Sequence, residues 1–195
     1  MMIADAVEFL RDRLNETIPR DVSGGSAEDL FVYAGTNKDD GVSFTANAVS
    51  ILLVRIEEET TLRRPDRYTQ VSADGVRKRV EPEIRLNLFI LFVARFPEDY
   101  RLSLQHLSRV VRYFQNHRVF NRENSQGLNE KIPQLVLELM TLSFSEQNEI
   151  WGALRAPYQP SALFKVKMVV FPDDDGEPVT AIKELIQTVV QVPSR

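Results

Sequence analysis

The sequence predicts an α+β fold in which amphipathic helices alternate with strands of a sheet. Near the N-terminus, apolar residues recur every three or four positions, which is the period of a helix. Residues 84–96 alternate, and both alternating sets are apolar in the middle, which predicts a strand covered on both faces. An apolar run from Val49 to Ile56 passes without a turn signal into three glutamates, so this strand is predicted to leave the body of the domain.

Length and composition limit the function classes that need to be considered. A chain of 195 residues fits one domain with a sizeable core, and its net charge of −4 provides no bulk attraction to nucleic acid or anionic membranes. The absence of cysteine excludes disulfides and thiolate chemistry and suits a reducing compartment. The N-terminus lacks the apolar core of a secretory signal, and no apolar stretch approaches the ~18 residues of a membrane span.

The first helix is predicted to end near Pro19, with one buried face that contains Ile3, Val7, Leu10 and Leu14. A polar loop follows at residues 20–29. A short strand is expected at Leu30–Ala34, and a turn at Gly35–Gly41.

The long strand from about Val49 to Leu62 has its natural partner in residues 84–96. Between these strands, residues 63–81 are predicted to form a projecting β-arm, because Asp74-Gly75 is a favoured hairpin turn. The arm is strongly basic, and its cations are Arg63, Arg64, Arg67, Arg77, Lys78 and Arg79.

A second helix is predicted from about Asp99 to Gln115, with an apolar stripe opposite a polar face. The stripe contains Tyr100, Leu104, Leu107, Val111 and Phe114, and the polar face contains Arg101, Gln105, Ser108, Arg109 and Arg112. A strand at Leu135–Phe144 is followed by a short helix, which Ser145 is expected to cap and which carries Trp151. A further strand at Phe164–Phe171 precedes the acidic turn and a tail of mixed helical and strand signals.

Residues that could carry chemistry are few. His106 and His117 lie eleven positions apart, which is roughly 16 Å of helical rise and too far for one metal ion. Asp173–Asp175 begin a loop whose sixth position is Pro178 rather than the glycine of a calcium-binding loop. We therefore expect no catalytic residues, no cofactor and no metal, and predict that the protein is not an enzyme.

The charged residues favour protein contacts instead. Glu57, Glu58 and Glu59 lie at the base of the basic arm, and the six arm cations are suited to acidic strand ends on a neighbouring subunit. These nine residues form the candidate subunit interface. The arm also permits a nucleic-acid contact, although Tyr68 is its one aromatic residue for base stacking.

Four segments resemble the cap, or tail-terminator, proteins of extracellular contractile injection systems, phage-tail-like particles of the virulence-cassette and antifeeding-prophage type. They are Val49–Arg64 (VSILLVRIEEETTLRR), Met2–Asn15, Leu86–Phe120 and Leu135–Phe171, which includes APYQPSALFKV. Together they cover most of the chain in the family's order. The loop from Arg20 to Ser43 and the tail after Phe171 match poorly.

The resemblance implies a mixed, mainly antiparallel sheet with helices packed on it. It also implies a structural cap that forms a homohexameric ring on the last disc of the inner tube, contacts the contractile sheath and stops both polymers. Its partners would be itself, the inner tube protein and the sheath protein, with no small-molecule substrate and no nucleic acid. Assembly in the bacterial cytoplasm is expected, as part of a phage-tail-like particle of a kind that can be released.

On this interpretation residues 1–171 form a single cap domain, and residues 172–195 form a tail. The apolar residues Ile186, Val189, Val190 and Val192 suggest that the tail adds a strand to a neighbouring sheath subunit, although packing on its own domain is an equal alternative. The alternative functions are a tube-initiating or baseplate adaptor of the same particle, or a nucleic-acid-binding accessory protein.

Overall fold

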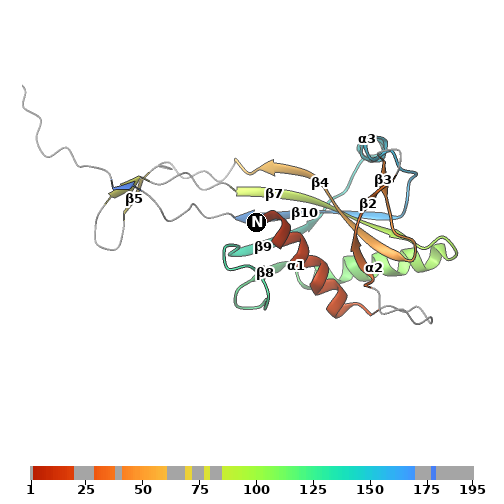
Figure 1. Ribbon diagram of the computed structural model, residues 1–195, viewed down its shortest axis with the longest axis horizontal. Coiled ribbons are helices and arrows are strands. Elements are labelled where there is room, and N and C mark those ends of the chain that lie inside the picture. Colours follow the sequence, from red (N-terminus) through yellow and green to blue (C-terminus); the bar gives the residue numbers. More distant parts are fainter. Residues whose placement is uncertain are drawn as a thin grey trace, which may run out of the picture. The chain divides into compact units, whose positions relative to one another are not determined.

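A computed structural model of the chain describes residues 2–19, 29–37, 41–60, 69–71, 77–79, 85–169 and 177–178. The chain forms two compact units (Figure 1). The larger unit comprises Met1–Leu62 with Glu83–Phe171, and the smaller comprises Arg63–Pro82 with Pro172–Arg195. The predicted division into residues 1–171 and a tail from 172 stays a prediction.

The larger unit is built on a six-stranded sheet with the strand order β1-β4-β7-β10-β9-β8. Its strands are β1 (Phe31–Tyr33), β4 (Ala48–Glu58), β7 (Arg85–Arg95), β8 (Val119–Asn121), β9 (Gln134–Leu139) and β10 (Ser161–Val169). Only the β1–β4 pair is parallel in this sheet, which confirms the predicted α+β fold with a mixed, mainly antiparallel sheet. A small hairpin of β2 (Gly35–Thr36) and β3 (Val42–Ser43) stands at the predicted turn.

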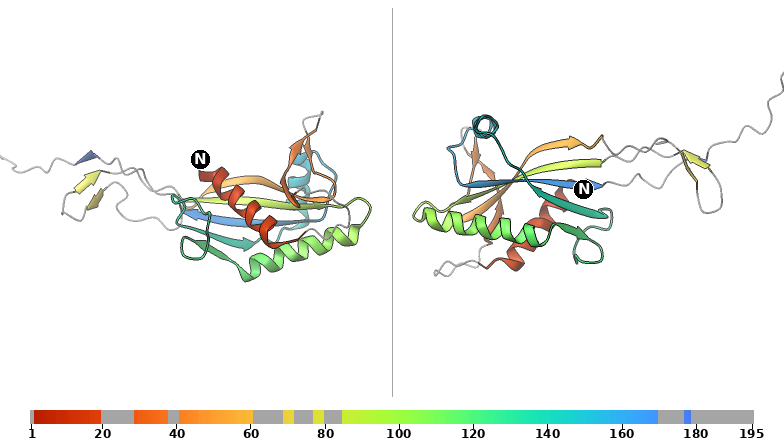
Figure 2. Two further views of the ribbon diagram at one scale, coloured as in Figure 1. Left: turned by 60° about the horizontal axis from the view of Figure 1, so that its bottom comes forward. Right: turned by 180° about the vertical axis from the view of Figure 1, so that it is seen from behind.

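Two helices cover one face of the sheet (Figure 2, left). Helix α1 (Met2–Thr17) buries Val7, Leu10 and Leu14 as its periodicity predicts, together with Ala6 and Phe9. The Asn15 side chain connects α1 to the edge strand β1 through two hydrogen bonds. Its amide nitrogen donates to the Phe31 carbonyl (2.9 Å), and its amide oxygen accepts from the Phe31 backbone amide (2.8 Å).

Helix α2 (Tyr100–Asn116) begins at Asp99, whose carboxylate accepts a hydrogen bond from the Leu102 amide. The predicted apolar stripe is wrong at its start, since Tyr100 is 63% exposed and Leu104 is 44% exposed. Ser103 and His106 are buried in their place, because both meet Phe96 at the end of β7. The Ser103 hydroxyl accepts from the Phe96 amide, and the His106 ring stacks on the Phe96 ring at 4.8 Å.

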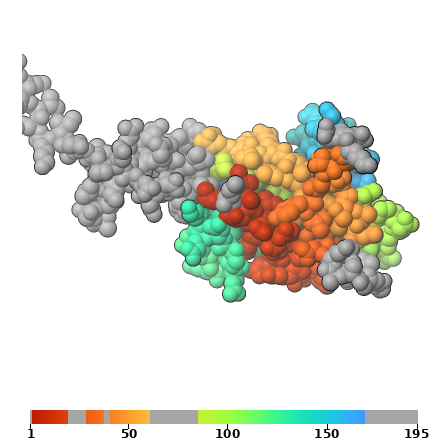
Figure 3. All heavy atoms as spheres, viewed as in Figure 1, coloured from red at the N-terminus to blue at the C-terminus, as the bar shows by residue number. Residues whose placement is uncertain are grey.

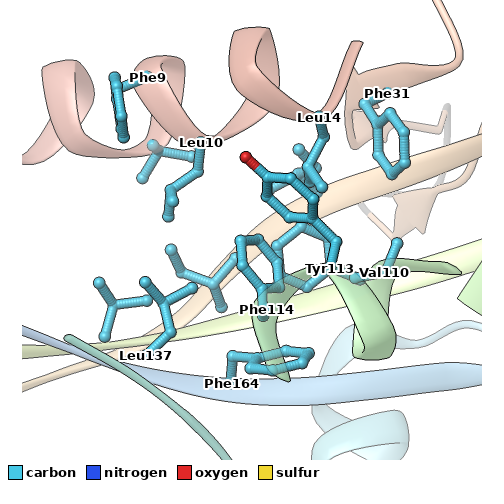
Figure 4. Close-up of a cluster of buried hydrophobic side chains, with 14 of the residues drawn as sticks. Phe9, Leu10, Leu14, Phe31, Val110, Tyr113, Phe114, Leu137 and Phe164 are labelled. Atoms are coloured by element: carbon cyan, nitrogen blue, oxygen red, sulfur yellow. The ribbon is translucent and has the colours of Figure 1, made fainter. Parts of the chain in front are cut away.

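Aromatic rings from both helices and from the strands meet between these helices and the sheet (Figure 4). Phe114 of α2 lies 5.0 Å from Phe164 of β10 between ring centroids, and Phe92 of β7 lies 5.5 Å from Phe114. Phe9 of α1 meets Phe120 of β8 edge-on at 5.4 Å, which ties the far strand of the sheet into the same core.

The opposite face of the sheet is covered by α3 (Phe144–Leu154) and the loop that carries Phe44. The cap of α3 is Ser143, not the predicted Ser145, and Ser143 and Glu146 form a capping box. Hydrogen bonds from the Ser143 amide and hydroxyl lower the pKa of Glu146. Trp151, the one tryptophan of the chain, is buried and packs edge-on against Phe44 at 5.7 Å between ring centroids.

The smaller unit contains the short strands β5 (Thr69–Val71), β6 (Arg77–Arg79) and β11 (Glu177–Pro178). Strands β5 and β6 pair antiparallel, as the predicted hairpin requires, and β11 pairs with the other edge of β6. The turn at Asp74-Gly75 lies outside the described residues, as do Arg63, Arg64, Arg67 and the apolar tail residues. That the hairpin projects as an arm stays a prediction.

The aromatic core makes a quantitative prediction about stability. Phe92→Ala removes a fully buried ring that contacts Phe114 and Phe164, so the free energy of unfolding should fall by about 3–5 kcal/mol in a denaturant titration. The matched control is Phe144→Ala, the same chemical change at a side chain that is 88% exposed, and its effect should stay within about 0.5 kcal/mol. Equal losses for the two variants would contradict the packing described here.

Candidate functional site

The face of the sheet that carries α3 is covered at one end and charged at the other. Two rows of neighbouring residues cross the strands β4, β7, β10 and β9 at the charged end. One row is Arg55, Phe89, Lys165 and Glu138; the next is Glu57, Asn87, Lys167 and Val136. We call the residues Arg55, Glu57, Asn87, Phe89, Glu138, Lys165 and Lys167 the open sheet face.

A change of register in β4 directs its charged residues to this face. Leu53 pairs with Ile90 and packs on the core beneath α1 and α2. The pairing then shifts between Leu53 and Arg55, as at a β-bulge, so that Arg55 lies opposite Phe89. Strict alternation would have placed Arg55 on the same face as Leu53. Because of the shift, Arg55 and Glu57 instead lie on the open sheet face.

The charges of the open sheet face interact with one another and with the ring beneath them. The Lys167 ammonium lies 2.6 Å from Glu138, and the Arg55 guanidinium lies 3.3 Å from Glu57. The cations of Arg55 and Lys165 lie 5.5 Å and 5.8 Å from the centroid of the Phe89 ring. Both ion pairs are well exposed, so each contributes little to stability, on the order of 0–1 kcal/mol.

Asn87 is the polar residue that orders the end of β4. Its side chain is 2% exposed, and its amide nitrogen donates a hydrogen bond to the Glu59 carboxylate at 3.1 Å. The Glu59 backbone amide also donates to the Arg85 carbonyl at 2.7 Å. The predicted acidic cluster is therefore split: Glu57 lies on the open sheet face, Glu58 pairs with Leu86 in the next register position, and Glu59 is held by Asn87.

The structure brings together charges that the sequence prediction treated separately. Of the predicted interface cations, Arg77, Lys78 and Arg79 form β6 in the smaller unit. Arg55, Glu138, Lys165 and Lys167 were not predicted as site residues. In the sequence, Lys165 and Lys167 alternate with apolar residues, which indicates that one face of this strand is polar. The sequence does not show that Glu138 lies beside them, because this depends on the order of the strands in the sheet.

We next considered the side chains that could bind a metal ion or carry out catalysis in the described part of the chain. Within those residues there is no cluster of three or more His, Asp or Glu side chains that could hold a metal ion. His117 caps the C-terminal end of α2, where its ring stacks on that of Tyr113 at 4.6 Å. It is therefore remote from His106, which is buried further along the same helix. No helix among the described residues is long and apolar enough to cross a membrane.

Solved structures that share this fold include the following two. One is the sheath/tube terminator of the PVC extracellular contractile injection system in its extended state, with a TM-score of 0.60 at 16% sequence identity over 99% of this chain. The other is the tube-terminating cap of the anti-feeding prophage, with a TM-score of 0.53 at 19% identity over 96% of this chain. The chain spans 66% and 60% of the length of these two proteins.

No curated protein sequence matches the chain. A family model does: the one described as the Pvc16 N-terminal domain aligns with residues 5–182, which includes every described strand and helix except the first residues of α1. The chain therefore belongs to the Pvc16 N-terminal domain family.

Proposed function

We propose that this protein is a structural cap of a contractile injection system, which sits on the distal end of the inner tube and sheath and terminates both. The family match over residues 5–182 carries this proposal, and the shared fold with a sheath/tube terminator and a tube-terminating cap supports it. The proposed partners are further copies of the chain, the inner tube protein and the sheath protein. Assembly would take place in the cytoplasm before any release of the particle.

The open sheet face supports an assembly role over a catalytic one. Its charges are exposed and paired side by side, so they stabilise the fold only weakly and are available to a partner. Mixed-sign charge of this kind selects partner and register more than it adds affinity. The function we propose requires no reaction and no cofactor.

A ring of identical subunits requires two complementary surfaces, because each contact is heterologous and the rotation must close. We assign the acidic surface to Glu57, Glu58 and Glu59 at the end of β4. The basic surface is assigned to Arg63, Arg64, Arg67, Arg77, Lys78 and Arg79 of a neighbouring copy, in a homohexamer. The tail residues Ile186, Val189, Val190 and Val192 are assigned to the sheath contact.

Particles from a strain that lacks this protein test the function directly. We expect electron micrographs to show tubes of uncontrolled length or sheaths that detach, since nothing then ends either polymer. Gold-labelled protein should lie at the end away from the baseplate. Normal particles would refute the capping role, and label at the baseplate would identify an adaptor instead.

Exchanging two paired charges tests the subunit contact without unfolding the protein. Arg55→Glu/Glu57→Arg keeps an ion pair on the same face of β4 but reverses the charge offered at each position. We expect an unchanged melting temperature and a ring that dissociates at lower salt, measured by sedimentation. The control Glu130→Lys/Lys131→Glu makes the same exchange in the exposed loop before β9 and should assemble normally. Normal assembly by both variants would argue against the acidic surface.

Removal of residues 178–195 tests the proposed tail contact. The helices and strands of the larger unit end at Val169, before this segment, and the deletion takes only Pro178 from β11, so the truncated protein should fold and form its ring. We expect particles that carry this ring on the tube but do not retain the sheath, scored by negative-stain microscopy. Intact sheathed particles capped by the truncated protein would show that the tail has another role.

A further inference from the structure

The outer face of α2 carries positive charge. Helix α2 contains three arginines and not one aspartate or glutamate. The residues Arg101, Leu104, Gln105, Ser108, Arg109 and Arg112 line a shallow hollow of about 590 Å³ on this helix. We call these six residues the basic face of α2. Within the described part of the chain, Arg101 and Arg112 have no ion-pair partner.

The basic face is also partly apolar, which distinguishes it from an ordinary solvated surface. Leu104 belongs to the face and is 44% exposed, and Tyr100, the first residue of α2, is 63% exposed. Arginine, tyrosine and exposed apolar side chains together are typical of residues that become buried at a protein interface. A partner for this face should therefore be acidic and should offer contact to an apolar side chain.

Helix α1 presents the complementary charge. Glu8, Asp12 and Glu16 follow one another at four-residue intervals, so they form a stripe along one side of the helix. Their side chains are 57%, 51% and 66% exposed. Figure 3 shows α1, in red, uncovered across the middle of the visible face. We call these three residues the acidic stripe of α1.

The arginines of α1 leave the acidic stripe with net negative charge. Arg11 lies 2.6 Å from Asp12 and is held over the Tyr33 ring, with its guanidinium 4.8 Å from the ring centroid. Arg13 lies 3.2 Å from Glu16 and 5.7 Å from the Phe9 centroid. Both arginines are only about a quarter exposed, so they lie at the side of the helix, and the three carboxylates dominate its outer surface.

We propose that the basic face of α2 docks on the acidic stripe of α1 in a second copy of this chain, and that this helix–helix contact joins neighbours in the ring. The proposal rests on the proposed cap function and adds a contact that is independent of the arm. Both helices bury their inner sides in the same core. Arg109, at the edge of the basic face, donates a hydrogen bond to the Pro19 carbonyl just beyond α1 (3.4 Å), whereas Arg101 and Arg112 are exposed to solvent and face a second copy. The contact is heterologous, as a closed ring requires.

The spacing of the charges suits such a contact. Arg101 and Arg109 are eight residues apart, as are Glu8 and Glu16, and eight residues correspond to about 12 Å along a helix. Leu104 then lies between the charged ends, where apolar burial adds to the weak exposed ion pairs. Because all of these charges except Arg109 are exposed in the free chain, the contact should weaken as salt is raised.

The absence of cysteine from the chain allows a direct test of proximity. Ala4 and Gln105 are exposed, one on the side of α1 that carries the acidic stripe and the other on the basic face. In the assembled cap, Ala4→Cys/Gln105→Cys treated with a short bis-maleimide should give a ladder of linked copies on a denaturing gel. Each single variant should stay monomeric. Dimers from a single variant, or no ladder from the double variant, would overturn the proposal.

Charge reversal tests the energetics. Arg101→Glu/Arg112→Glu should weaken association of purified copies by about tenfold or more, and Glu8→Arg/Glu16→Arg should do the same. The fourfold variant that combines both reversals should recover association, which a contact with tube or sheath would not produce. The control Lys131→Glu changes an exposed cation outside both faces and should associate normally. Failure of the fourfold variant to recover, while each twofold variant folds, would overturn the proposal.

Two further outcomes distinguish the helix contact from a nucleic-acid surface and from the cap function itself. Salt-sensitive nucleic-acid binding that Arg101→Glu/Arg112→Glu abolishes, with association unchanged, would make the face a nucleic-acid surface and refute the helix contact. If instead the ladder is absent but particles still need the protein for a defined length, the helix contact is wrong and the cap function stands.

Discussion

Burial of β7 on both of its faces is the constraint on which the rest of the structure depends. From Leu88 to Ala94 its side chains are buried alternately beneath the α1–α2 layer and beneath α3. A strand buried in this way must have both neighbours in place, and β4 and β10 pair with it along nearly its whole length. The helices and the Trp151 cluster then cover the two faces of β7, and the outer strands pair with the neighbours of β7.

The cover on the α3 side ends before the strands do. Beyond Phe89 the same strands continue without a second layer, so their side chains there must tolerate water, and they are charged. Buried Asn87 marks the boundary, because its amide is satisfied by Glu59 and keeps the end of β4 ordered without apolar packing. One sheet thus contains a folded core and an ordered surface that is available to another molecule.

Most of the fold was predictable from the sequence, because strong periodicity reports burial directly. The pairing of β4 with β7 and the two-sided cover of β7 followed from alternation alone. Which side of α2 is buried could not be predicted at its start. Ser103 and His106 are polar, yet they are buried because they contact Phe96, and a search for apolar residues does not find such contacts. The cap of α3 was misplaced by two residues, since Ser143 and Ser145 have the same chemistry and only geometry selects between them. The open sheet face needed the strand order, which joins Glu138 to Lys167 across 29 positions.

The register shift divides β4 into an inner segment whose residues are constrained by packing and an outer segment whose residues are not. Residues up to Leu53 must fit a packed core, whereas Arg55 and Glu57 after it lie on the open sheet face, where Arg55 rests on the Phe89 ring and no second layer covers them. Substitution in the outer segment therefore carries little folding cost, and compensating changes on a partner can accumulate there without repacking the interior. Relatives with this strand can diverge in whom they recognise while they keep a common scaffold, which fits a fold shared at under 20% identity.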